Sequence, residues 1–320
     1  MTELIDGFAH IMPREVYHAF ADTHPTEMLL SHDAEHFWDV ERRVADMDTY
    51  GIDRQVLTLA SPPSWRGIDR GDALELTRLA NDEIARIAER RQSRFIPTAT
   101  LPFLSGEFLD EFDRCIEDLG VAGVQIFSTV DGTPLDDEAF RPFFEKAAAA
   151  DVPVWMHPQL SEYAITGDSV FYAKVFGWLF DTSVALARLV FSGIMQQFPE
   201  LTIIPHHMGG MIPHFADRIA TFYEARDFYP HEGWAELDEP VLKYFRRFYG
   251  DTVLNGSVSS LECGYDFFGA DQLIFATDYP YGPDGGRKWL REIPASIRRM
   301  DATDDEKRQI IGGNLKRLIE

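Results

Sequence analysis

The sequence contains little cysteine, a deficit of positive charge and no long apolar segment. Its 320 residues include only Cys115 and Cys263, which argues against a disulfide framework and favours buried free thiols in a reducing cytoplasm. No apolar run approaches the ~20 residues of a membrane span, and the opening MTELIDGF is not a secretory signal. Acidic residues outnumber basic ones by 53 to 30, for a formal charge of −23, so neither nucleic acid nor an anionic membrane is an expected partner.

Short apolar segments rich in β-branched residues predict eight strands. They are Leu4–Ile11, Gln55–Ala60, Phe95–Thr100, Ala122–Phe127, Val152–His157, Leu201–His206, Thr252–Asn255 and Leu273–Thr277. Amphipathic stretches such as Ala73–Glu89 separate them. Buried strands that alternate with helices indicate a parallel sheet, and eight such units favour a closed (β/α)₈ barrel, the TIM-barrel fold. The alternative is an open doubly wound sheet, which usually has a Gly-rich turn after its first strand, unlike DGFAHIMP.

Three connections are longer than ordinary loops. Met12–Trp38 follows the first predicted strand, Pro158–Asp181 follows the fifth, and Phe228–Phe248 follows the sixth helix. Insertions after barrel strands lie on the carboxyl face and cover the site there. The sequence has no repeat, low-complexity run or Ser/Gly linker, so we expect residues 1–320 to form a single domain.

Polar residues end four of the predicted strands, in IDGFAHIMP, VWMHP, IIPHHMGG and IFATDYP. In a barrel these ends meet at one mouth, and imidazole and carboxylate are ligands that borderline divalent metals prefer. Taken alone, a histidine at a strand end is more often structural, and an aspartate before Tyr-Pro is often a turn residue. The coincidence of His10, His157, Asp278 and either His206 or His207 on one face favours a functional site.

At these residues the chain resembles the amidohydrolase-related enzymes typified by aminocarboxymuconate-semialdehyde decarboxylase and gamma-resorcylate decarboxylase. The resemblance runs from IDGFAHIMP to IIGGNLKRLIE and is most specific in VWMHP, HHMGGMIPHFADRI and FATDYPYG. It implies a metal-dependent hydrolase type of barrel in which His10, His157 and Asp278 bind zinc or manganese. It also implies that His207 is a catalytic acid/base, with His206 as a possible substitute, because strand alternation should turn only one of these two inward.

The first strand departs from the family pattern. The family usually has Asp-x-His-x-His there, or Glu in place of the first histidine, whereas this chain has Phe8. Phe8 and His10 are two residues apart, so both should face the barrel interior. Phenylalanine cannot ligate a metal, but three protein ligands plus water form a workable catalytic site. The alternative is a weakly held or absent metal, with Phe8 packed against the substrate.

The resemblance implies a non-oxidative decarboxylase acting on an aromatic or unsaturated cyclic carboxylic acid. Asp278 would both ligate the metal and shuttle a proton. Candidate substrate-binding residues are Phe8, Arg42, Phe127, Trp155 and Tyr279, although an aromatic in such a position is more often plain core and an arginine like Arg42 is more often on a solvated helix face. A hydrolase of a lactone, amide or carbon–carbon bond is the main alternative, and a degenerate barrel that only binds a small ligand is the third. The family analogy also implies a homodimer or homotetramer.

Overall fold

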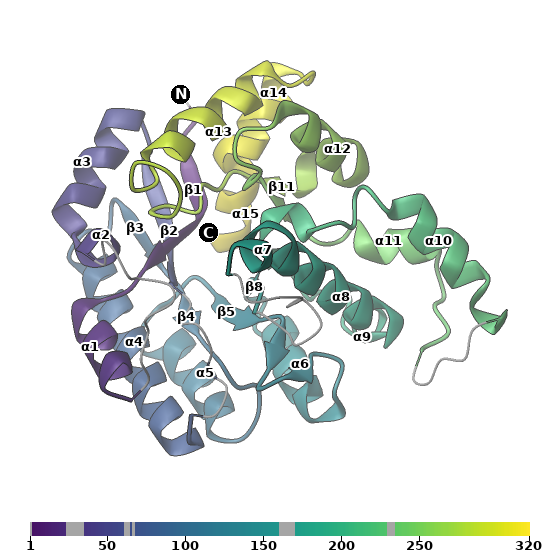
Figure 1. Ribbon diagram of the computed structural model, residues 1–320. Helices are drawn as coiled ribbons and strands as arrows, with labels where there is room; N and C mark the ends of the chain where they lie inside the picture. The colour runs from purple at the N-terminus through teal and green to yellow at the C-terminus, as the bar shows by residue number, and fades with distance from the viewer. Residues whose placement is uncertain (1, 24–34, 61–64, 66–67, 160–169, 229–233) are drawn as a thin grey trace.

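The computed structural model describes residues 2–23, 35–60, 65, 68–159, 170–228 and 234–320 (Figure 1). Its strands are β1 (Ile5–Ile11), β2 (Arg54–Leu59), β3 (Phe95–Pro97), β4 (Ala99–Thr100), β5 (Val124–Phe127), β6 (Thr129–Val130), β7 (Thr133–Pro134), β8 (Val154–His157), β9 (Ile203–Pro205), β10 (Gly250–Asp251) and β11 (Leu273–Ile274). The pairs β1–β2, β2–β3, β4–β5, β5–β8, β8–β9 and β10–β11 are all parallel. Among the described residues, only the short β6–β7 hairpin is antiparallel.

Backbone hydrogen bonds continue between these sheets and close the ring. Thr98, between β3 and β4, donates its N–H to Leu57 of β2. Tyr249 donates to Ile203, which joins β9 to the strand region of β10, and Gly7 donates to Phe275, which joins β1 to the segment after β11. The predicted (β/α)₈ barrel is therefore confirmed, and β3 and β4 together form one of its eight strands.

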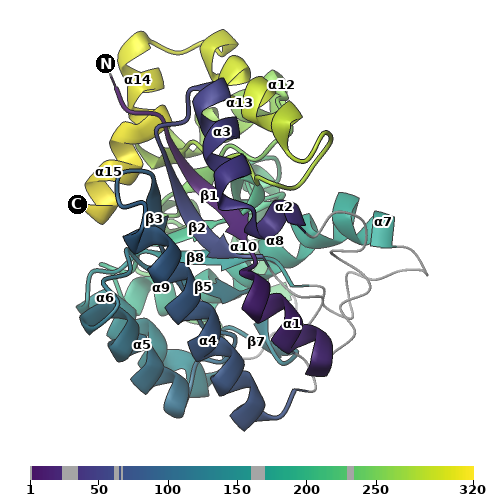
Figure 2. The same ribbon diagram turned by 90° about the vertical axis from the view of Figure 1, so that its left-hand side faces the viewer.

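Helices surround these strands in both views (Figures 1 and 2). They are α1 (Arg14–Thr23), α2 (Glu35–Trp38), α3 (Val40–Tyr50), α4 (Arg70–Glu89), α5 (Glu107–Glu117), α6 (Arg141–Ala149), α7 (Val170–Tyr172), α8 (Trp178–Phe191), α9 (Ile194–Gln197), α10 (Ala216–Glu224), α11 (Val241–Phe245), α12 (Val258–Phe268), α13 (Arg287–Arg299), α14 (Asp304–Arg308) and α15 (Asn314–Ile319). Within the described residues, no helix is both long enough and apolar enough to cross a membrane.

The apolar residues form two cores, as expected for strands buried on both faces. The larger core lies between the strands and the helices. The smaller fills the barrel and takes its side chains from successive strands: Ile5, Phe8, Val56, Ile96, Trp155, Ile204, Val253, Ile274, Ala276 and Leu315. Leu315 belongs to α15, so this helix contributes to the interior at the end of the barrel where the two termini lie (Figure 2). The opposite end is left for the strand-end polar residues.

The predicted strand positions hold with one correction. The seventh strand, predicted at Thr252–Asn255, lies at Gly250–Asp251. Its two residues are a glycine and an aspartate, which have low strand propensity. The apolar residues on which the prediction rested follow this strand. The β6–β7 hairpin was not predicted.

Two predicted insertions border the carboxyl ends of the strands. The first contains α1 and α2, and its residues 24–34 lie outside the described part of the chain. The second contains α7 and the start of α8, and its residues 160–169 are likewise not described. The third long connection includes α11, with residues 229–233 not described. Phe37 of α2 packs on Tyr281, and Trp178 of α8 packs on His157, so both strand insertions contribute to the barrel mouth.

Candidate active site

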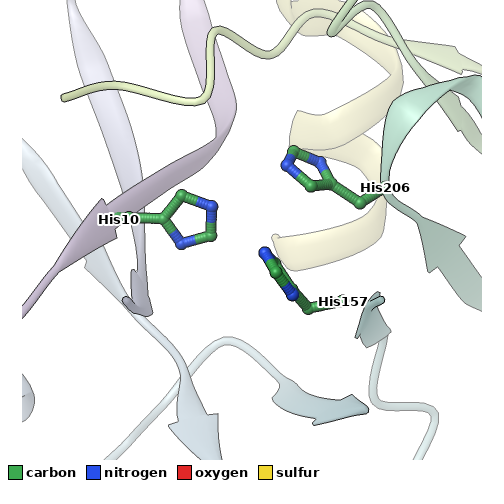
Figure 3. A group of neighbouring side chains, drawn as sticks. All are labelled: His10, His157 and His206. Carbon is green, nitrogen blue, oxygen red and sulfur yellow. The ribbon is translucent and has the colours of Figure 1, made fainter. Parts of the chain in front are cut away.

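Three histidines from distant parts of the sequence meet at the barrel mouth. His10 comes from β1, His157 ends β8 and His206 follows β9, and Figure 3 shows their rings converging on one space. One nitrogen from each lies within 4.8 Å of the others. His206, His207 and Asp278 form a second such group that shares His206. The structure therefore brings together all the strand-end residues that the sequence singled out.

Each of these three rings is held through its Nδ1 atom. His10 Nδ1 lies 3.0 Å from the hydroxyl of Thr58, and that hydroxyl donates to the carbonyl oxygen of Ala9. His157 Nδ1 lies 2.7 Å from the carbonyl oxygen of Pro158. His206 Nδ1 lies 2.5 Å from Asp251 Oδ2. The Nε2 atoms are thereby left to face the shared space.

Asp278 lies beside two of these Nε2 atoms. Its Oδ1 is 3.1 Å from Nε2 of His10 and 3.3 Å from Nε2 of His206. The contact with His10 does not meet hydrogen-bond geometry, so His10 Nε2 is buried with no hydrogen-bond partner among the described residues. A buried polar nitrogen without a partner is costly unless another group binds it.

The pKa values of the four histidines and Asp278 are shifted in different directions. Burial lowers the pKa of His10 and His157, and it lowers the pKa of His207 to about 3. Burial would also lower the pKa of His206, but the carboxylates of Asp251 and Asp278 outweigh it and raise that pKa to about 9. Burial would raise the pKa of Asp278, yet His10 and His206 bring it below its ordinary value. Asp278 is therefore ionised at neutral pH, and His207 is neutral.

His206 and His207 both reach the site because the strand ends before them. β9 stops at Pro205, and both His207 and Met208 have left-handed backbone, each with φ of 57°. Side chains alternate between faces only while the backbone stays extended. The ring centroids of His206 and His207 are consequently 3.9 Å apart. The prediction that only one of them would face the mouth was therefore wrong.

Aromatic side chains surround the histidines. Phe8 stacks on His206, with ring centroids 4.0 Å apart and planes at 28°. Phe127 lies edge-on to His157 at 6.4 Å. Trp178 stacks on His207 at 6.2 Å and 12°, and Tyr281 packs edge-on against His10 at 5.2 Å. The mouth is therefore polar at its centre and apolar around it.

The other predicted substrate-binding residues lie further from the histidines. Trp155 is buried in the barrel interior and donates its indole N–H to the Gly7 carbonyl. The Tyr279 hydroxyl donates to Asp46, and Arg43 lies over its ring. Arg42 Nε is 4.0 Å from Asp46. None of these contacts tests a role in substrate binding, which stays a prediction for each.

Sequence reasoning missed four residues that shape the site: Thr58, Trp178, Asp251 and Tyr281. Thr58 and Asp251 hold imidazoles, and Trp178 and Tyr281 pack on them. Asp251 follows a glycine just before the predicted seventh strand, and its role depends on a contact 45 residues distant in the chain. Tyr281, in contrast, lies within the FATDYPYG segment and two residues beyond the tyrosine that was chosen.

Comparison with known proteins agrees with this geometry. The chain is 31% identical over 262 residues to a gamma-resorcylate decarboxylase of Rhizobium sp. (strain MTP-10005), covering 75% of this chain and 76% of that protein. It is 28% identical over 284 residues to a 2-amino-3-carboxymuconate-6-semialdehyde decarboxylase of Dictyostelium discoideum, covering 87% and 75%.

A solved structure shares the fold along almost the whole chain. It is a 5-carboxyvanillate decarboxylase from Novosphingobium aromaticivorans, complexed with manganese and 4-hydroxy-3-methoxy-5-nitrobenzoic acid. Its TM-score is 0.86 at 25% identity, with 99% of this chain and 96% of that chain covered. A model of the amidohydrolase family, Amidohydro_2, matches residues 5–319. The chain thus belongs to the amidohydrolase family, within which these relatives are decarboxylases.

Proposed function

We propose that the protein is a metal-dependent, non-oxidative decarboxylase of an aromatic or unsaturated cyclic carboxylic acid. The observation that carries this proposal is the group of buried imidazoles and one ionised carboxylate, bordered by aromatic rings at the mouth of the barrel. Such a site offers a place for a cation, a proton carrier and apolar walls for a ring. The relatives named as decarboxylases of carboxylated rings support the same reaction.

The donor set fits a divalent metal. His10 Nε2 is a buried nitrogen with no hydrogen-bond partner in the described residues, and His157 and Asp278 lie beside it. Two imidazoles and a carboxylate suit zinc or manganese, and the manganese in the Novosphingobium decarboxylase favours manganese. We propose His10, His157 and Asp278 as ligands. When bound, the metal would supply positive charge that holds the carboxylate or an adjacent hydroxyl of the substrate.

The chain's own residues would position the ring and move the proton. Phe127 and Tyr281 border the histidines and would restrict the substrate plane. Decarboxylation breaks the bond between the ring carbon and the carboxylate carbon, and a proton takes the place of the departing carbon dioxide. Asp278 is ionised and would relay that proton. His207 is neutral, and its Nδ1 has no hydrogen-bond partner among the described residues, so it can serve as the acid/base.

Arg42 is proposed to hold a second polar group of the substrate. Its Nε atom is buried and lacks a hydrogen-bond partner within the described chain. One of its terminal nitrogens lies near Gly285, a few residues beyond Asp278. Phe8, Trp155 and Tyr279 would act more indirectly, by packing behind the groups that contact the substrate.

The test is a screen of hydroxybenzoates and related ring carboxylic acids with metal-loaded and chelator-treated protein. We expect carbon dioxide release, incorporation of one solvent deuterium on the ring, and loss of turnover on chelation that manganese restores. Turnover of lactones or amides with uptake of solvent ¹⁸O, and no carbon dioxide, would contradict the proposal. Turnover unaffected by chelation would contradict its metal dependence.

We also propose that two copies of the chain associate through exposed aromatic residues of the segment 171–180, which contains most of α7 and the start of α8, and of the segment 215–222, which contains most of α10. Phe171, Tyr172, Phe176, Phe180, Phe215 and Phe222 are exposed there by 65, 55, 65, 39, 39 and 41%. At roughly 200 Å² per aromatic side chain, they expose on the order of 600 Å², comparable with the ~800 Å² that each partner buries in a typical interface. Light scattering should give a dimer or tetramer, and Phe176→Glu should yield monomers. A monomeric wild type would contradict this.

Two further expectations complete the proposal. We propose that residues 1–320 form one amidohydrolase domain, which the family match over residues 5–319 supports. We propose a cytoplasmic location, since Cys115 and Cys263 are both free thiols. Quantitative thiol titration of freshly purified protein under denaturing conditions should give two thiols per chain.

A further inference from the structure

We propose that His206 is a metal ligand that takes over the role of the side chain missing at Phe8, and that Asp251 positions it. This inference rests on the proposed metal site and deepens it by adding a third imidazole. It also separates the two adjacent histidines, since His207 is then the acid/base and not a ligand.

The partners of Nδ1 assign the same protonation pattern to three histidines. The Pro158 carbonyl can only accept, so His157 Nδ1 carries the proton. The Asp251 carboxylate accepts from Nδ1 of His206 in the same way. The Thr58 hydroxyl uses its own proton on the Ala9 carbonyl, so it accepts from Nδ1 of His10. With Nδ1 protonated, the neutral form of each ring has its lone pair on Nε2.

Three Nε2 atoms therefore point into one buried space. The donor nitrogens lie within 4.8 Å of one another. Ligands at ~2.1 Å from one ion in a tetrahedral arrangement lie about 3.4 Å apart, so the group needs to contract by about 1.4 Å or less to bind a metal. Figure 3 shows the three rings arranged around this space. His206 Nε2 lies 3.3 Å from Asp278 Oδ1, and a metal ion would take the place of the proton between these two atoms.

Phe8 explains why the third imidazole comes from β9 and not from β1. Its ring lies 4.0 Å from the His206 ring in a stacked arrangement and is fully buried. It therefore occupies the space next to His206 and fixes the plane of that imidazole. Phe8, which cannot bind a metal, thus supports His206, which can.

Asp251 is built to hold His206 in one orientation. It is fully buried, and its Oδ1 accepts backbone N–H groups from Met208 and Val253, each at 3.0 Å. This leaves Oδ2 for His206 Nδ1 at 2.5 Å. A carboxylate that fixes the far nitrogen of a metal-bound histidine orients the ring and increases its basicity. Asp251 acts through His206 and is a positioning residue.

His207 lacks such an anchor. Its Nδ1 has no hydrogen-bond partner in the part of the chain that is described, and its ring packs between His206 and Trp178. Without a fixed Nδ1 proton, the ring can accept and release protons at either nitrogen. It is also less buried than His206. These properties suit a group that exchanges protons with substrate.

The test measures Mn²⁺ binding to the chelator-treated full-length protein by calorimetry. His206→Ala should raise the Kd by more than about 10-fold, and Asp251→Asn by about 10- to 100-fold. The matched control is His207→Ala, at the adjacent residue, which should change the Kd by less than about threefold. Circular dichroism and thermal melts would verify that each variant is folded. A loss of affinity in His207→Ala with none in His206→Ala would overturn the assignment.

A second measurement needs no variant. Electron–nuclear double resonance of Mn²⁺ bound to the wild type should show three directly coordinated imidazole nitrogens, and two would overturn the proposal. The result is independent of turnover. If no ring acid is decarboxylated but three nitrogens are found, the proposed function fails and the ligand assignment stands. If decarboxylation is observed with two nitrogens, the reverse holds.

Discussion

Replacing Asp278 with asparagine should abolish most of the turnover while leaving the fold intact. The substitution keeps the shape of the side chain but removes the charge that lies 3.1 Å from His10 Nε2 and 3.3 Å from His206 Nε2. An amide cannot relay a proton, and loss of a positioned acid/base group typically costs about 10²–10⁴ in rate. That corresponds to roughly 3–5 kcal/mol in activation free energy. We therefore expect kcat to fall by at least about 100-fold, with a smaller change in KM.

The assay is carbon dioxide release from the best substrate of the screen, at saturating Mn²⁺ so that weaker metal binding does not account for the loss. The matched control is Asp113→Asn, which removes a carboxylate from a partly exposed ion pair with Lys146. It should stay within about threefold of the wild type, as expected for a surface ion pair. An Asp278→Asn enzyme with kcat within threefold of wild type at full metal occupancy would refute the role given to this carboxylate.

Three further predictions concern packing and titration around the site. Gly7→Ala should lower the free energy of unfolding by about 1–3 kcal/mol, because the new Cβ would lie 2.5 Å from Ile274 Cγ2 and 3.1 Å from the Phe275 oxygen. An unchanged denaturation midpoint would contradict this packing. Burial raises the pKa of Asp6 from 3.8 to about 6, so its protonated form stabilises the fold at pH 4 and this contribution is lost as pH rises through 6. The stability of wild type relative to Asp6→Asn should therefore fall by about 2 kcal/mol between pH 4 and 7, and a constant difference would argue against a raised pKa of Asp6. Trp178→Ala should lower kcat/KM by about 2- to 10-fold through loss of its stacking on His207, whereas Trp178→Phe should retain most of it; equal losses would count against stacking.

The arrangement of the barrel was readable from the sequence because each strand is a short apolar segment that ends in a polar residue. The same period of two placed Phe8 and His10 on one face, and their rings do lie 5.4 Å apart. Where the backbone remains extended, side-chain direction follows from counting residues. The sequence therefore predicted that His10, His157 and Asp278 would meet.

The same counting fails where the strands end. His207 and Asp278 both have left-handed backbone, with φ of 57° and 64°, which alternation does not describe. It cannot decide between His206 and His207, nor show that Tyr281, and not Tyr279, packs on His10. The role of Asp251 could not be predicted for a different reason. Its contact with His206 depends on the tertiary structure, and an aspartate after a glycine gives no sequence signal of its own.

The proposed replacement of a ligand on β1 by His206 after β9 shows how a metal site can keep its chemistry when one ligand position changes. A phenylalanine at position 8 removes one donor, but the barrel brings eight strand ends to the same mouth, so a neighbouring strand can supply another. The replacement is effective only if the new imidazole is held as firmly as one on a strand. Asp251 meets that need with both of its oxygens. The cost is an acidic group and several imidazoles buried together, a cost that cation binding would offset, since ligand binding to the folded state stabilises it.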